Sequence, residues 1–87
     1  MTDIADTLTE RGARYGDFNE QAAIAQTLKK VMRANGKFGQ LQPDQREALD
    51  LIANKISRIL NGDPNYHDSW HDIQGYAKLV ADRIAKK

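Results

Sequence analysis

The side chains best suited to binding a ligand fall in the second half of the chain, at Lys55, Arg58, Asp72 and Tyr76. With about 100° of rotation per residue, Lys55 and Arg58 lie on one shoulder of the apolar stripe of their predicted helix. Asp72 and Tyr76 lie on the shoulder of the same rotational sense in the helix that follows. Lys and Arg side chains bind phosphate and a Tyr ring stacks on a base, so these residues predict a site for an anionic ligand such as a nucleotide.

Two helices joined by a short connection must position these side chains. The first is predicted over residues 43–61, with Pro43 in its first turn and Asn61-Gly62-Asp63-Pro64 as its end. The second is predicted over residues 68–86, opening at Asp68 or Ser69 with Ser69-Trp70-His71-Asp72 as a capping box. Because the connection is short, the two helices are expected to form an antiparallel hairpin.

The hairpin brings the two shoulders together on one side. Lys55 lies late in its helix and Asp72 early in the next, so both fall at the same level. The ligand-binding candidates are Arg14, Tyr15, Lys55, Arg58, Asp68, Asp72 and Tyr76. A purely structural interpretation stays open, because helix dipoles already favour cations at a C-terminus and acids at an N-terminus. Exposed ion pairs of this kind contribute only about 0–1 kcal/mol.

A weak helix is predicted at the start of the chain, over residues 2–11. Ile4 and Leu8 lie one turn apart on a thin apolar face, and Gly12 is expected to end the helix. Arg14-Tyr15-Gly16 then forms a short break.

The next helix has readable start and stop signals. Asp17 and Glu20 form a capping pair at its beginning, and Asn35-Gly36 predicts a left-handed stop at its end. Its apolar stripe consists of Ile24, Leu28, Val31 and Met32. The stripe of the 43–61 helix consists of Ala48, Leu49, Ile52, Ile56, Ile59 and Leu60. The last helix has a stripe predicted to be buried, made of Trp70, Ile73, Ala77, Val80 and Ile84.

Together these segments predict a single all-α domain over residues 1–87. It is a small helical bundle of three strong helices and one weak N-terminal helix, built on the antiparallel hairpin of about 43–61 and 68–86. A chain of 87 residues has a modest core, and small domains of this kind often rely on oligomerisation.

Gly75 is placed inside the last helix on the face opposite the apolar stripe. A glycine there costs about 1 kcal/mol relative to alanine. Close approach of the first helix or of a partner chain would explain it. Gly75 is therefore an interface candidate, and a homo-oligomer is expected.

Composition excludes several functions. The chain has 13 Lys and Arg against 12 Asp and Glu, a net charge of +1, which provides no basic surface for nucleic acid. No cysteine is present, so disulfides and thiolate metal sites are excluded. No apolar run approaches a membrane span and the first residues lack the order of a signal peptide, so a cytoplasmic protein is expected.

The histidines and serines do not predict a catalytic site. His67 and His71 have metal-like spacing, but His67 is placed before the helix begins and no third ligand is evident. Ser57 and Ser69 are the only serines, and Ser69 is explained as a cap. No metal site or catalytic triad is therefore predicted, and no cofactor is expected.

Three motifs together resemble a family of small phage and prophage proteins of unknown function. They are an early Tyr15-Gly16, the run Lys55-Ile56-Ser57-Arg58-Ile59 with the following Gly62, and Asp68-x-x-x-Asp72-Ile73-x-Gly75-Tyr76-Ala77. The likeness covers about residues 11–80. It implies a phage-accessory role in the host cytoplasm and supplies no reaction or ligand.

The chain is also distantly similar to the MazG-like all-helical nucleotide pyrophosphohydrolases. These enzymes hold Mg²⁺ against a triphosphate with E-x-x-E and E-x-x-D motifs. Asp17-x-x-Glu20 and Glu47-x-x-Asp50 imitate that spacing, but the first pair is explained as a cap and Asp50 is predicted to point outward. Mg²⁺ is expected only if this resemblance extends to activity, which would require subunits to combine their acids.

Two functions therefore remain open. The first is a noncatalytic phage-accessory module that binds a protein partner, with self-association. The alternative is a nucleotide-ligand protein, either a binder or a relative of the pyrophosphohydrolases.

Overall fold

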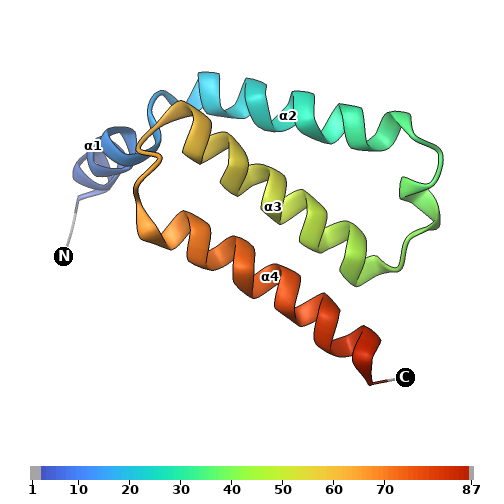
Figure 1. Ribbon diagram of the computed structural model, residues 1–87. Helices are drawn as coiled ribbons and strands as arrows, with labels where there is room; N and C mark the ends of the chain where they lie inside the picture. Colours follow the sequence, from blue (N-terminus) through green and yellow to red (C-terminus); the bar gives the residue numbers. More distant parts are fainter. Residues whose placement is uncertain (1–2, 87) are drawn as a thin grey trace.

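The computed structural model describes residues 3–86, which form four α-helices and one short 3-10 helix (Figure 1). The elements are α1 (Ile4–Tyr15), α2 (Phe18–Ala34), η1 (Phe38–Gln40), α3 (Pro43–Asn61) and α4 (His67–Ala85). The prediction of an all-α small bundle is confirmed, with no strand among the described residues. In the same part of the chain, no helix combines the length and the apolar character that crossing a membrane requires.

Helix α1 is longer than the sequence predicts. Asp3 caps its start by accepting a hydrogen bond from the Ala5 amide at 3.4 Å, while Thr2, the predicted first residue, lies outside the described residues. The helix continues through Gly12, so the predicted end at that residue is wrong. It ends at Gly16, whose φ of 78° reverses the chain, because only glycine adopts this conformation readily.

Helix α2 starts as predicted and stops differently. The Asp17 carboxylate accepts a hydrogen bond from the Glu20 amide at 3.2 Å, which confirms the predicted cap. The predicted left-handed stop at Asn35-Gly36 is wrong, because among the described residues only Gly16 has a positive φ. Asn35 is extended instead, and its side-chain oxygen accepts a hydrogen bond from the Lys37 amide at 2.8 Å.

The hairpin of α3 and α4 is confirmed with one corrected boundary. Pro43 occupies the first turn of α3 as predicted. Helix α4 begins at His67, before the predicted Asp68 or Ser69. The capping box at Ser69 is therefore wrong, since Ser69 lies within the helix and is buried.

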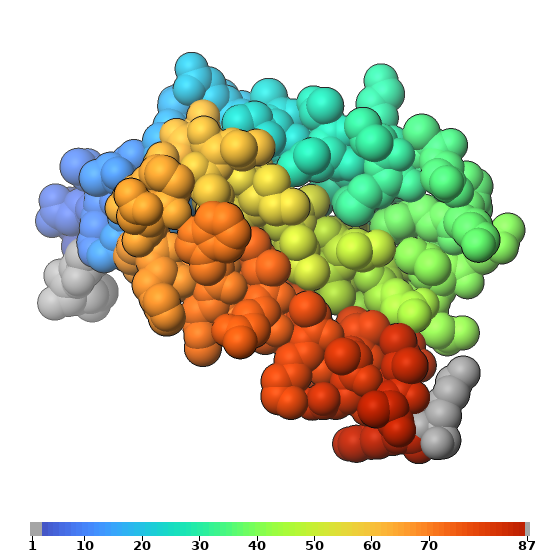
Figure 2. All heavy atoms as spheres, viewed as in Figure 1, coloured from blue at the N-terminus to red at the C-terminus, as the bar shows by residue number. Residues whose placement is uncertain are grey.

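Helices α2, α3 and α4 lie side by side with α3 in the middle (Figure 1). Both outer helices pack against α3, and neither packs closely against the other. Figure 2 shows the same arrangement, with atoms of α3 visible between those of α2 and α4. Helix α1 crosses one end of this layer, where it contacts α2 and α3. The bundle is therefore open, because neither outer helix closes over α3, most of whose residues are half-buried.

The contacts inside the layer are made mainly by small side chains. The buried residues are Gln21 and Ala25 of α2, Phe38 of η1, Ala48, Ala53 and Ser57 of α3, and Ser69 of α4. Small residues allow helix axes to approach closely, so α3 contacts neighbours on two sides. The prediction that the stripe of α4 is buried is wrong. Trp70 and Ile84 are 54% and 45% exposed, Ala77 is also exposed, and Ile73 and Val80 are only half-buried. A single stripe of large residues on α3 cannot pack against both α2 and α4, because these two helices lie on different sides of α3.

Candidate functional site

Lys55 and Asp72 form the ion pair that the hairpin geometry predicts. Their Nζ and Oδ2 atoms lie 2.8 Å apart, and the Lys55 side chain is only 14% exposed. The hydrogen bond from Lys55 lowers the pKa of Asp72 below its ordinary value, against the opposing effect of burial. Because Lys55 is already neutralised by Asp72, an added anion would have to compete with this carboxylate.

Arg58 is the less committed cation of the predicted cluster. Its guanidinium lies over the Tyr15 ring, 4.9 Å from the centroid. The Nε of Arg58 is buried and has no hydrogen-bond partner among the described residues. Arg58 therefore keeps donor capacity that an anion or an ordered water would use.

Aromatic rings connect Arg58 to the end of α1. Tyr15 and Tyr66 meet edge to face with centroids 6.1 Å apart, and the Arg14 guanidinium covers the Tyr66 ring at 5.0 Å. Arg14 also pairs with Glu10 at 2.6 Å. The structure thus brings the candidates Arg14, Tyr15 and Arg58 into one layered group where α1 meets α3.

Two glycine-containing turns pack closely against each other beside this group. The Asn61 side-chain amide donates hydrogen bonds of 2.9 Å to the carbonyl oxygens of Tyr15 and Asp17. A Cβ on Gly16 would overlap the Asn61 carbonyl, and a Cβ on Gly62 would overlap the backbone of Arg14 and Tyr15. Sequence reasoning assigned Gly16 to a short break and Asn61 and Gly62 to a helix end, and did not predict that the two turns dock on each other.

Asp68 and Tyr76 are not drawn into contact with Lys55 or Arg58. Asp68 accepts a hydrogen bond from the Tyr66 hydroxyl at 3.1 Å, which raises the pKa of Tyr66. Tyr76 lies farther along α4, where it lines a shallow cavity of about 180 Å³ between α3 and α4 together with Leu51 and Leu79. The predicted cluster is thus divided into a Lys55–Asp72 pair, an Arg58 group and a separate Tyr76.

Gly75 lies on the exposed side of α4. A Cβ added there would meet no atom within 4 Å, so the predicted approach of the first helix is wrong. A role in contact with a partner chain stays a prediction. His67 and His71 do share a face of α4, with rings stacked at 5.6 Å, because the helix begins at His67. Residues 3–86 contain no group of three or more side chains arranged to hold a metal ion.

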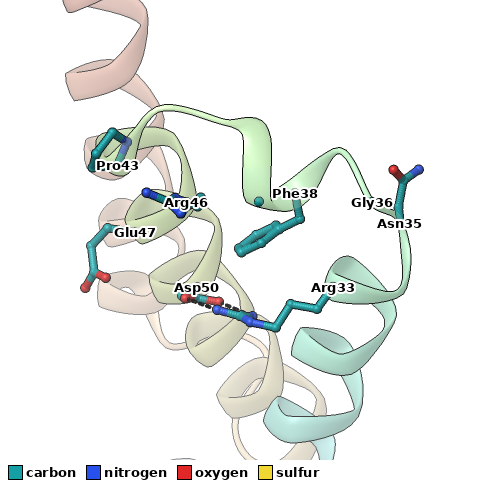
Figure 3. A pocket seen from close by; sticks show the side chains of 9 residues that line it. Arg33, Asn35, Gly36, Phe38, Pro43, Arg46, Glu47 and Asp50 are labelled. Atoms are coloured by element: carbon teal, nitrogen blue, oxygen red, sulfur yellow. Dashed lines mark hydrogen bonds and ion pairs between the residues drawn. The ribbon is translucent and has the colours of Figure 1, made fainter.

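A second polar site lies where α2 meets the start of α3, and sequence reasoning did not predict it. Arg33 binds Asp50 through two hydrogen bonds of 2.8 and 2.7 Å, and its guanidinium covers the buried Phe38 ring at 4.4 Å (Figure 3). The hydrogen bonds from Arg33 lower the pKa of Asp50. The prediction that Asp50 points outward is wrong, because it faces α2. The only signal available was the charge of Arg33 at the end of its helix.

The open cavity beside this pair, of about 710 Å³, carries mixed charges. Arg46 and Glu47 line it together with the Arg33–Asp50 pair (Figure 3). Since Arg33 and Asp50 neutralise each other, the lining has no net preference for an anion or a cation. The contacts of Arg33 with Asp50 and Phe38 therefore indicate a structural role, which is to stabilise the connection between α2 and α3.

The two acidic motifs compared with the pyrophosphohydrolases do not fit a shared Mg²⁺ site within one chain. Asp17 caps the start of α2, whereas Asp50 binds Arg33 near the end of α2. At 1.5 Å per residue these ends lie roughly 24 Å apart. Asp50 is also neutralised by Arg33, so its oxygens are already occupied. One chain therefore cannot gather both motifs around one ion.

A further surface, which is mainly apolar, lies on one face of the helical layer. On α3 and α4 an open groove of about 320 Å³ brings Leu49 and Ile52 together with Ala77 and Val80. At about 100° per residue, the same sector of α3 contains Ile56 and Leu60, and that of α4 contains Trp70, Ile73 and Ile84. Leu60 is 67% exposed and Trp70 54%.

Helix α2 extends this surface. Val31 is 66% exposed and lies about 160° around the helix from Arg33, which binds α3 on the opposite, polar face of the layer. Ile24 and Leu28 share its stripe and are half-buried. We call this surface the open apolar face. Its residues are Ile24, Leu28 and Val31 of α2, Leu49, Ile52, Ile56 and Leu60 of α3, and Trp70, Ile73, Ala77, Val80 and Ile84 of α4. No Lys, Arg, Asp or Glu lies within its sector of α3 or α4.

The comparisons with known proteins identify a family without adding a function. No curated protein and no solved structure matches the chain. A family model described as a domain of unknown function, DUF6378, matches residues 2–84. The chain therefore belongs to the DUF6378 family, a family defined by a domain of unknown function.

Proposed function

We propose that this protein is a noncatalytic helical interaction module that binds a protein through its open apolar face. The observation that carries the proposal is the exposure of Val31, Leu49, Leu60, Trp70 and Ile84 on that face, while small residues make most of the buried contacts inside the chain. Contiguous exposed apolar surface of this kind marks interaction sites in soluble proteins. The accessory role in phages or prophages that the sequence resemblance implies is compatible with such a module.

The division of side chains supports binding over internal packing. Ala53 and Ser57 are buried within α3, whereas Leu60 in the same helix is 67% exposed. A helix normally buries its largest apolar residues in the core of its own domain. The reverse pattern is expected where a second molecule supplies the missing layer, because domains are built from at least two packed layers.

Two leucines provide a matched test. Leu60 and Leu79 are 67% and 71% exposed, but Leu79 lies on the other side of the hairpin, near Tyr76. At low micromolar protein, Leu60→Glu and Leu79→Glu are both expected to keep their helix content and an unfolding free energy within about 0.5 kcal/mol of each other. Ala53→Glu, which places a charge between helices, is expected to unfold the chain.

Circular dichroism and urea titration measure these outcomes. A loss of several kcal/mol for Leu60→Glu that does not depend on protein concentration would show that the face is an internal core, and the proposal would fail. A loss that appears only at high protein concentration would support it, because coupled association makes stability depend on concentration.

A second candidate function is the binding of a nucleotide or another phosphate-bearing ligand near Arg58. The observation that favours it is the buried Nε of Arg58, which has no acceptor among the described residues. Thermal-shift measurements with nucleoside triphosphates, with and without Mg²⁺, test it. Stabilisation that is lost in Arg58→Gln and retained in Lys78→Gln, a solvent-exposed control, would support binding. No shift at millimolar ligand would exclude it.

A further inference from the structure

We infer that the partner on the open apolar face is a second copy of this chain, packed layer against layer about a two-fold axis. The inference rests on the proposed function, since it names the molecule that covers the same face. Its starting point is the shape of the chain. A compact chain of 87 residues has a radius of gyration of about 12 Å, whereas this chain has 14.9 Å.

The exposed area gives the size of the missing contact. A compact monomer of this mass exposes about 5,200 Å², whereas this 9.8 kDa chain exposes 6372 Å². The difference is roughly 1,200 Å², and a stable interface of standard size buries about 800 Å² on each partner. The surplus is therefore large enough to supply one two-fold contact of standard size between equal chains.

The residue composition of the open apolar face allows two identical copies of the face to contact each other. A two-fold contact brings each residue opposite residues of the same surface, so any charge near the axis meets a like charge. The sector of α3 and α4 on this face contains no charged residue, and its polar member on α3 is Gln45. Interfaces between identical subunits are also the most apolar class of interface, comparable to a divided core.

The position of α3 determines the centre of the pair. Because α3 is the middle helix, its apolar residues lie at the centre of the face and those of α2 and α4 flank them. In the pair, Ile56 and Leu60 of one copy pack against the apolar residues of the other. Lys55, Asp72 and Asp50, which form the Lys55–Asp72 and Arg33–Asp50 pairs with their partners, lie outside the apolar sectors of α3 and α4.

Light scattering after size exclusion tests the inference on the full chain. At 200 µM the wild type and Leu79→Glu are expected to have twice the mass of one chain, and Leu60→Glu the mass of one. A wild-type mass of one chain at this concentration overturns the inference. It is also overturned if Leu79→Glu dissociates the pair and Leu60→Glu does not.

Small-angle scattering separates this failure from that of the proposed function. If the wild type is a single chain with a radius of gyration near 15 Å, the open apolar face is exposed in solution. The proposed function then holds, and only the inference of a second copy fails. A single-chain wild type with a radius near the 12 Å of a compact chain means that the layer has closed on itself, and both proposals then fail.

Discussion

The side-chain amide of Asn61 lies 2.9 Å from the carbonyl oxygen of Tyr15, joining the end of α3 to the end of α1 across 46 positions of the chain. The same amide reaches the carbonyl oxygen of Asp17 at 2.9 Å. One side chain therefore satisfies two backbone acceptors at the turn between α1 and α2. This contact holds the end of α1, where the Arg58 guanidinium lies over the Tyr15 ring.

Replacing Asn61 with alanine is expected to lower the free energy of unfolding by about 1–2 kcal/mol, because both carbonyl oxygens lose their donor. Asn65→Ala is the control, since Asn65 is exposed and its side chain makes no hydrogen bond among the described contacts. Urea titration of the two variants measures the difference. Equal stability of Asn61→Ala and Asn65→Ala would contradict the structural role of the junction.

Gly75→Ala is expected to raise the free energy of unfolding by about 0.5–1 kcal/mol, because alanine restricts the unfolded chain and favours the helix. The added Cβ meets no atom within 4 Å. Gly75 also lies about 160° around α4 from Ala77 of the open apolar face, so association should not change. Thermal unfolding and light scattering measure both effects. Loss of association in Gly75→Ala would instead establish the predicted contact of Gly75 with a partner chain.

Stability is expected to fall in acid partly through Asp50. Arg33 lowers the pKa of Asp50, so the stabilisation is present above the ordinary Asp pKa of about 3.9 and is lost as the pH falls through the lower folded value. Asp50→Asn should cost about 1 kcal/mol or less at pH 7. The difference from wild type should disappear near pH 2. Urea titrations at both pH values test this, and a difference that persists in acid would contradict the ion pair.

Much of the fold follows from the sequence because the starts of α2 and α3 depend on local signals. The Asp17 cap and Pro43 in the first turn of α3 are read directly from residue type and spacing. The end of α1 was misplaced, because Gly12 and Gly16 are equivalent in local terms. Only the contact of Gly16 with Asn61, distant in the chain, selects the second glycine.

The candidate site was predictable only in part. Lys55 and Asp72 meet because a short connection determines both the direction and the level of the two helices. Assigning Asp72 and Tyr76 to the same shoulder of the helix did not show that Tyr76 lies one turn farther along α4 than Asp72. The arrangement of the stripes was missed for a different reason. Periodicity shows which residues share a face, but it does not show whether that face meets the same chain or another molecule.

Trp70 provides the most direct test of the central claim, that the open apolar face is covered by association. It is the only tryptophan of the chain, it belongs to that face, and it is 54% exposed in the single chain. Acrylamide quenching of its fluorescence should weaken severalfold as wild-type protein is raised from 1 to 200 µM, while Leu60→Glu stays strongly quenched throughout. Quenching of the wild type that equals that of Leu60→Glu at every concentration would contradict the account.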